Sequence, residues 1–133
     1  MIWPWRRPHL FNRGAYTLHS GAASMFKIDC DALTDADLDV IAAELYVRLP
    51  AFQRAFGVPR GGVRLAKALD RAYSITDSGR ILIVDDVLTT GLSMEFARND
   101  RAKEFPDAEI IGAVIFARLD PPPWVTALFR MAL

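Results

Sequence analysis

The chain has 133 residues, 52% of them hydrophobic, and its 16 basic and 16 acidic side chains cancel to a formal net charge of zero. This balance gives no electrostatic footprint for nucleic acid or an anionic membrane, and no apolar run is long enough to span a bilayer. Cys30 is the single cysteine, which excludes an internal disulfide or a cysteine metal cluster, so we expect one small domain over residues 1–133.

Residues 1–33 are predicted to form an N-terminal arm and a hairpin. The arm contains Arg6 and Arg7 between prolines but lacks the apolar run of a secretory signal, so we expect a cytoplasmic protein. Two segments with aromatic and branched residues, 16–18 and 25–28, then flank the small residues 20–23. This arrangement predicts two paired strands.

Residues 34–49 are predicted to form a helix. Thr34 and Asp37 have the spacing of an N-cap residue and its acidic partner, and Pro50 ends the pattern. The apolar residues that repeat at helical spacing predict a core face: Leu38, Ile41, Ala42, Leu45 and Leu49.

A strand, a glycine-rich loop and a second helix are predicted next, over residues 51–57, 58–62 and about 63–73. Two glycines before a helix allow backbone N–H groups to approach a polyanion closely, and Arg60 adds positive charge. The alternative is a tight turn with a surface arginine.

Residues 81–93, with the sequence ILIVDDVLTTGLS, are the most informative stretch. The apolar run 81–84 predicts a strand buried on both faces, as in a parallel sheet covered by helices. Asp85 and Asp86 then fall at its carboxyl end, where open α/β sheets bind ligands. Residues 89–93 bring hydroxyls and a glycine to the start of a helix, which favours an anion. The alternative is a strand that ends in a solvated acidic turn.

The remaining residues predict a helix over 91–104 and a third parallel strand over 108–118, with Arg118 at its carboxyl edge. Three prolines, residues 121–123, are expected to break the chain away from the sheet. The apolar tail that follows, residues 124–129, is expected to cover the core or to mediate a homodimer.

Residues 81–93 resemble the phosphoribosyl-pyrophosphate (PRPP) binding motif of type I phosphoribosyltransferases, in which two acids hold the ribose hydroxyls and the next loop wraps the 5′-phosphate. Residues 60–62, one βα unit earlier, resemble that family's diphosphate loop. The resemblance implies a three-layer, Rossmann-like α/β fold, with a short, mostly parallel sheet between helices. Residues 34–118 would form this core, residues 1–33 the arm and a small hood, and residues 119–133 a tail.

The hairpin segment resembles the hood of orotate phosphoribosyltransferases. The matching residues are Tyr16, Thr17, Leu18, Ser20, Gly21, Ser24, Phe26, Ile28 and Asp29. His19 stands where the family has a lysine, and Lys27 replaces an aromatic residue. Both are candidate cations for an acidic base.

The resemblance also implies roles for individual residues. Those expected to contact PRPP are Pro59, Arg60, Gly61, Gly62, Asp85, Asp86, Val87, Leu88, Thr89, Thr90, Gly91, Leu92 and Ser93. Those expected to contact the base are His19, Phe26, Lys27, Arg118 and Trp124. Asp85, Asp86 and Arg60 are the expected catalytic residues. Mg²⁺ is expected as a cofactor that PRPP itself carries, near the two acids and without dedicated protein ligands.

The function that the resemblance implies is transfer of ribose 5-phosphate from PRPP to a nucleobase. Orotate is favoured because the hood pattern and Arg118 agree. One alternative is a purine enzyme that stacks its base on Trp124; another is a non-catalytic PRPP or nucleotide sensor. The sensor is suggested by residues 74–79, which alone separate the predicted helix from the next strand. Orotate enzymes place a further strand and a long cationic mobile loop there, so we expect slow turnover with intact PRPP binding.

Overall fold

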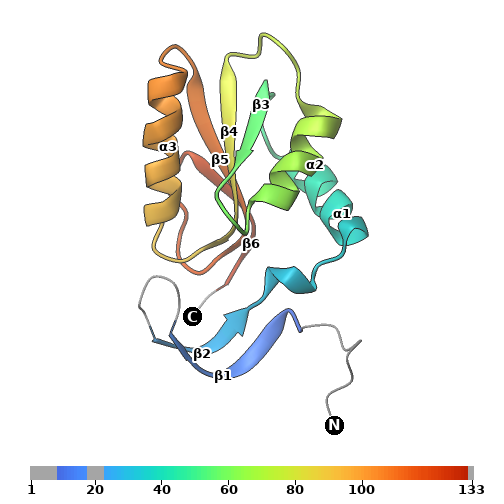
Figure 1. Ribbon diagram of the computed structural model, residues 1–133, viewed down its shortest axis with the longest axis vertical. Coiled ribbons are helices and arrows are strands. Elements are labelled where there is room, and N and C mark those ends of the chain that lie inside the picture. Colours follow the sequence, from blue (N-terminus) through green and yellow to red (C-terminus); the bar gives the residue numbers. More distant parts are fainter. Residues whose placement is uncertain (1–8, 18–22, 132–133) are drawn as a thin grey trace.

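The computed structural model describes residues 9–17 and 23–131, which form an α/β core with a separate two-stranded hairpin (Figure 1). In chain order the elements are β1 (Phe11–Thr17), β2 (Ala23–Ile28), the 3₁₀ turn η1 (Cys30–Ala32), α1 (Asp35–Tyr46), β3 (Arg54–Gly57), α2 (Val63–Tyr73), β4 (Arg80–Leu88), α3 (Leu92–Glu104), β5 (Glu109–Ala117) and β6 (Val125–Arg130). None of the helices in these described ranges is long and apolar enough to cross a membrane.

The core is a parallel sheet of four strands in the order β3-β4-β5-β6. Helices α1 and α2 cover one face and α3 covers the other (Figure 1). The predicted three-layer α/β architecture is therefore confirmed. The hairpin of β1 and β2, which we call the hood, pairs antiparallel and lies at one end of the sheet (Figure 1).

Strand β4 is buried on both faces because its apolar side chains alternate between two cores. Leu82 and Val84 pack in the core beneath α1 and α2, whereas Ile81 and Ile83 pack in the core beneath α3. All four are at most 1% exposed. Successive strand residues point to opposite faces, so the two acids that follow this run start from opposite sides of the sheet.

Helix α1 begins as the sequence predicts but ends earlier. The Thr34 hydroxyl accepts a hydrogen bond from the Asp37 N–H at 3.1 Å, and the Asp37 carboxylate accepts the Thr34 N–H at 2.8 Å. These reciprocal bonds satisfy two N–H groups at the helix start. The helix ends at Tyr46, and a tighter turn, with Arg48 N–H donating to Leu45 at 2.9 Å, carries the chain to Pro50.

The prediction that the chain leaves the sheet after residue 118 was wrong. Residues 125–130 form β6, which pairs parallel with β5 from Gly112↔Val125 to Ala117↔Arg130. Parallel neighbours usually need a crossover of a dozen or more residues. Here β6 starts opposite the middle of β5, and the extended, proline-rich residues 118–124 can span roughly 23 Å. The prolines therefore shape the connection between two strands.

Strand β3, one of the two edge strands of the sheet, has part of its free edge satisfied by a side chain. Asp70 of α2 accepts a hydrogen bond from the Ala55 N–H at 2.9 Å, and Arg54 Nε lies 3.8 Å from the same oxygen. A Cβ at Gly57 would come within 2.5 Å of the Val63 Cα, so the start of α2 lies directly against the end of β3. Short edge strands with charged side chains resist pairing with other chains.

The hood is held at the carboxyl end of β5. The Phe11 ring meets Phe116 edge-on at 6.2 Å, and Phe116 stacks on Phe129 of β6 at 5.5 Å. The Asp29 N–H donates to the Leu10 carbonyl at 2.6 Å and closes the base of the hairpin. The hood therefore stands beside the strand ends that carry the predicted site.

Replacing Asp70 tests how the β3 edge is stabilised. Asp70→Ala removes the acceptor of the Ala55 N–H and is expected to cost about 1–3 kcal/mol, whereas Asp70→Asn keeps an acceptor and should cost less. Urea denaturation of both variants measures the difference. Equal losses would show that the ion pair with Arg54, not the hydrogen bond, stabilises the edge.

Candidate functional site

The two acids at the end of β4 face different cavities. Asp85 lines a small cavity on the α3 side, and Asp86 lines a larger one on the side of α1 and α2. Each carboxylate accepts the N–H of the following residue, at 2.8 Å for Asp85 and 2.7 Å for Asp86. A group that contacts both acids must therefore lie across the end of the strand, between the cavities.

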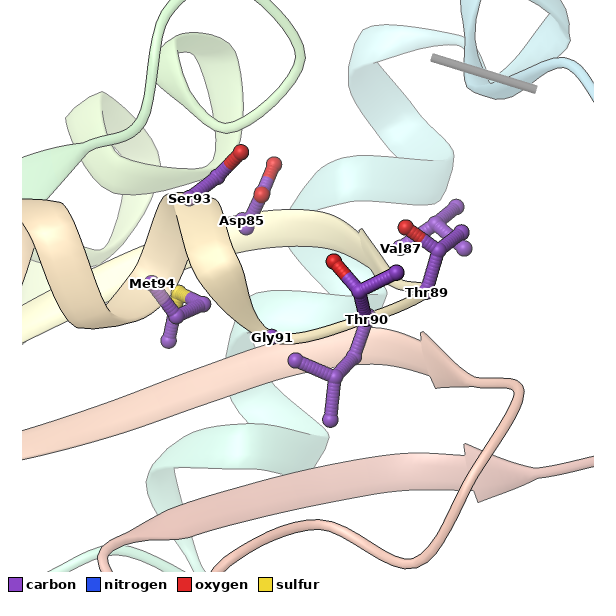
Figure 2. A pocket seen from close by; sticks show the side chains of 8 residues that line it. Asp85, Val87, Thr89, Thr90, Gly91, Ser93 and Met94 are labelled. Carbon is purple, nitrogen blue, oxygen red and sulfur yellow. The ribbon is translucent and has the colours of Figure 1, made fainter. Parts of the chain in front are cut away.

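The small cavity lies where β4 leads into α3. Its volume is about 20 Å³, room for roughly one water molecule. Figure 2 shows the Asp85 carboxylate and the Ser93 hydroxyl side by side and pointing the same way, with Thr89 and Thr90 to one side of both on the loop that joins β4 to α3. Its lining comprises Asp85, Val87, Leu88, Thr89, Thr90, Gly91, Ser93 and Met94. The structure thus brings the predicted hydroxyl loop beside the first acid, around a space smaller than a phosphate group.

The larger cavity has a volume of about 450 Å³, within the range of small-molecule sites. It is lined by Cys30, Asp31, Leu38, Arg60, Gly61, Val63, Arg64, Asp86 and Ile115. These residues come from the turn after the hood, both helices on that face, the glycine loop and two strands. The structure therefore joins Arg60 and Gly61 to the second acid.

Gly61 and Gly62 are required by close packing. A Cβ at Gly61 would overlap the Asp86 carboxylate, and a Cβ at Gly62 would overlap the Val84 carbonyl oxygen and lie 2.9 Å from the Asp85 Cα. The loop backbone thus lies directly against the end of β4. The Pro59–Arg60 peptide bond in this loop is cis.

Both helices that begin at the site start on glycine. Gly62 precedes α2 and Gly91 precedes α3, neither with a side-chain cap, and Gly91 has a φ of 87° that favours glycine. By contrast, α1 has the complete capping box at Thr34. Helix starts without side-chain caps leave N–H donors and the positive end of the dipole for an anion. Two such starts flank the acid pair.

Burial changes the acidity of two groups at the site. Desolvation, with the neighbouring Asp86 carboxylate, raises the pKa of Asp85 to about 8. Burial, reinforced by nearby acids of which Asp86 is the strongest, raises the pKa of the Cys30 thiol to about 12. Cys30 is therefore a neutral thiol in the cavity wall at physiological pH.

The predicted base-contacting residues are only partly accounted for. His19 lies outside the described residues. Phe26 and Lys27 lie on β2, opposite Arg13 and Asn12, but their side chains are also outside the description. Arg118 follows β5, where its N–H donates to the Leu88 carbonyl at 2.9 Å, and it lines neither cavity.

Trp124 packs on α3, away from both cavity linings. Its indole N–H donates to Glu95 at 3.2 Å, and the Arg98 guanidinium lies 4.7 Å from the ring centre. Gly112 makes room for it, because a Cβ there would come within 2.9 Å of the indole. These contacts favour a covering role for Trp124, so we do not include it in the base site.

Sequence reasoning missed several residues of the larger cavity. Arg64 lies four residues after Arg60, in the first turn of α2, and this second arginine near the glycine loop could have been noticed in the sequence. Cys30 and Asp31 belong to η1, whose position over the glycine loop depends on the hood and had no local signal. Only the tertiary structure brings these three together.

Alanine at the two loop glycines should have unequal effects. Gly62→Ala meets backbone at Val84 and is expected to cost about 1–3 kcal/mol or more, whereas Gly61→Ala meets only the Asp86 side chain, which can rotate away. Urea denaturation of both variants provides the comparison. A Gly62→Ala protein as stable as Gly61→Ala would contradict the close backbone packing described here.

The raised pKa of Asp85 makes stability depend on pH. In the folded protein Asp85 holds its proton up to about pH 8, whereas its ordinary pKa is 3.8. Between these values the folded state binds more protons, so its contribution to stability falls as pH rises. Asp85→Asn should remove this fall in stability with rising pH. Unfolding free energies of both proteins, measured between about pH 4 and pH 8, give the comparison. Identical pH profiles for the two proteins would contradict a partly buried, protonated Asp85.

No protein-family model and no curated protein matches the chain. Solved structures do. Orotate phosphoribosyltransferase from Aeropyrum pernix has a TM-score of 0.66 at 22% identity, over 91% of this chain and 88% of that one. The Mycobacterium tuberculosis H37Rv orotate enzyme has a TM-score of 0.65 at 18% identity, over 90% and 88%.

A purine enzyme is also similar. The Helicobacter pylori xanthine-guanine-hypoxanthine phosphoribosyltransferase has a TM-score of 0.53 at 20% identity, over 70% of this chain and 86% of that one. The arrangement of helices and strands described above is thus shared with enzymes of one architecture. The chain has the fold of the type I phosphoribosyltransferases.

Proposed function

We propose that the chain is a phosphoribosyltransferase that transfers ribose 5-phosphate from PRPP to orotate. One observation carries the proposal: the acid pair lies between two glycine-initiated helix starts, with an arginine loop on one side and a hydroxyl loop on the other. Acids accept hydrogen bonds from a diol, and the helix starts favour phosphates. PRPP carries a diol between a monophosphate and a diphosphate.

The residues have distinct roles in this proposal. Asp85 and Asp86 hold the ribose hydroxyls across the end of β4, and residues 89–93 hold the 5′-phosphate once their loop opens beyond its present small cavity. Arg60 and the N–H of Gly61 bind the diphosphate, while the Gly62 N–H stays bonded to the Val58 carbonyl at 2.9 Å and holds the loop in shape. The larger cavity gives the diphosphate and base room on the other side of the acids.

The reaction is a substitution at the anomeric carbon. A ring nitrogen of the base forms the new bond to that carbon and loses its proton to solvent or to the leaving diphosphate, while the bond to the diphosphate oxygen breaks and the diphosphate leaves with the electron pair. Positive charge builds on the ribose ring between these events. In this proposal the Asp86 carboxylate stabilises the positive charge on the ribose, Asp85 holds a ribose hydroxyl, and Arg60 stabilises the charge on the leaving group.

Mg²⁺ fits this site as part of the ligand. Among the described residues, no group of three or more His, Cys, Asp or Glu side chains is placed to bind a metal ion. Asp85 and Asp86 are the acids nearest to the proposed diol, and oxygen is the donor that Mg²⁺ prefers. Bound through PRPP oxygens, it would neutralise the diphosphate.

Orotate is proposed as the base on the pattern of the hood. His19 and Lys27 provide candidate cations for an acidic base, and Arg118 follows β5 at the same end of the sheet. Orotate enzymes are also among the similar solved structures.

A PRPP or nucleotide sensor is the second candidate, favoured by the connection between α2 and β4. Residues 74–79 join these elements at the end of the sheet opposite the hood (Figure 1). This short connection cannot reach the strand ends that carry the acids. The cations of a mobile loop would then have to come from elsewhere, and turnover without them would be slow.

Replacing both acids tests the ligand site. Asp85→Asn with Asp86→Asn should weaken PRPP binding by about tenfold to a hundredfold, because the charged acceptor of Asp86 is lost beside an Asp85 that is already neutral at pH 7. The melting temperature should change by only a few degrees. Asp39→Asn removes one carboxylate from α1 at a residue that pairs with Arg71 and lines neither cavity, and is the matched control. Calorimetry with PRPP and Mg²⁺ measures the affinity.

Product formation from PRPP and orotate, assayed on the same preparations, decides the activity. Product from orotate but not from purines supports the proposal. Tight PRPP binding without product from any base identifies the sensor, and unchanged affinity in the double variant excludes the acid pair as the site.

A further inference from the structure

Both arginines of the larger cavity are paired with acids from one segment, residues 29–35, which joins the hood to α1. Arg60 Nη2 lies 3.3 Å from Asp31 Oδ2. Arg64 Nη2 lies 3.0 Å from Asp35 Oδ1 and donates to the Leu33 carbonyl at 3.1 Å. The segment therefore attaches to the glycine loop and to the first turn of α2.

The pair of Asp31 and Arg60 lies within the cavity lining, whereas Asp35 is not part of that lining. The turn η1 fixes the Asp31 backbone, because its N–H donates to the Asp29 carboxylate at 3.1 Å. The Asp31 side chain has no such constraint: it is 68% exposed, and the Arg60 side chain is 89% exposed. Asp31 is thus a negative charge held at the cavity beside the cation of the glycine loop.

We infer that Asp31 competes with a diphosphate ligand for Arg60 and so lowers the affinity of the site for polyanions. The identity of the ligand rests on the proposed function. A single contact at 3.3 Å between exposed side chains contributes little and does not fix a long arginine in place. A phosphate can bind a guanidinium through two parallel hydrogen bonds, which are stronger. The ligand therefore displaces Asp31, and the displacement reduces the observed affinity.

Asp31→Asn tests the competition, because it removes the charge and keeps the size of the side chain. Titration with inorganic pyrophosphate and Mg²⁺, and separately with PRPP, should give dissociation constants lower by about two- to fivefold, the range expected for an exposed ion pair. Asp39→Asn is the control. Asp39 carries the same charge on α1, lies 4.0 Å from Arg71 and does not line the cavity. Its dissociation constants should equal those of the wild type.

The Asp31→Asn substitution in an Arg60→Ala protein tells whether Asp31 acts by competing for Arg60 or by repelling the polyanion through its charge alone. If Asp31 acts through Arg60, Asp31→Asn gives no further gain in affinity when Arg60 is absent. A gain that persists there would overturn the inference, as would weaker binding by Asp31→Asn alone, which would make Asp31 a residue that positions Arg60. Circular dichroism of each variant checks that the fold is retained.

The two proposals can fail separately. If wild type and Asp31→Asn bind pyrophosphate but not PRPP, the proposed function fails, and the pyrophosphate titrations alone decide the role of Asp31. If PRPP binds and Asp31→Asn leaves both dissociation constants unchanged, the inference fails while the function stands. If no variant binds either ligand, both are wrong.

Discussion

The site depends on how closely the glycine loop approaches the end of β4. Val58 donates its N–H to the Val84 carbonyl at 2.8 Å, and Gly62 donates to Val58 at 2.9 Å, so the loop is attached to the strand where the acids begin. A side chain at residue 62 would overlap the backbone of β4, and one at residue 61 would displace the Asp86 carboxylate. The packing fixes the start of α2, and with it Arg64, relative to the acids. The close packing of the glycine loop on β4 therefore fixes the relative positions of the acids, the loop and the start of α2.

The same packing gives two adjacent acids different surroundings. Asp85 is partly buried on the α3 side and holds its proton to about pH 8, whereas Asp86 lies against Gly61 in the larger cavity. A protonated carboxyl can donate a hydrogen bond as well as accept one, but a carboxylate only accepts. The acid pair thus offers both kinds of contact to a hydroxyl-rich ligand at neutral pH.

Sequence reasoning succeeded where local pattern decides the structure. The run from Ile81 to Val84 predicts a strand buried on both faces, and the capping pair Thr34 and Asp37 predicts where α1 begins. These signals depend on neighbours in the chain. Strand β6 was missed because three consecutive prolines suggest that the chain leaves the sheet. Its pairing also depends on the free edge of β5, which is known only from the tertiary structure.

The candidate site was predicted less completely than the fold. The acids and both loops were predicted from their order along the chain. That the two acids line different cavities follows only from the structure, which shows which core each face of β4 packs against. Asp31 was missed because its contact with Arg60 spans 29 residues and depends on how the hood is placed. Trp124 was considered for the base because aromatic side chains suit stacking, yet its partners on α3 are distant in sequence.

The alternation along β4 also limits how this protein can change its length during evolution. Inserting or deleting a single residue in the apolar run would turn each later side chain to the opposite face. The acid on the α3 side would then face α1 and α2, or else the aliphatic residues would exchange cores. Insertions or deletions in this strand therefore preserve the site only if they add or remove an even number of residues. A loop such as residues 74–79 can change by any number, because no alternation of faces depends on it.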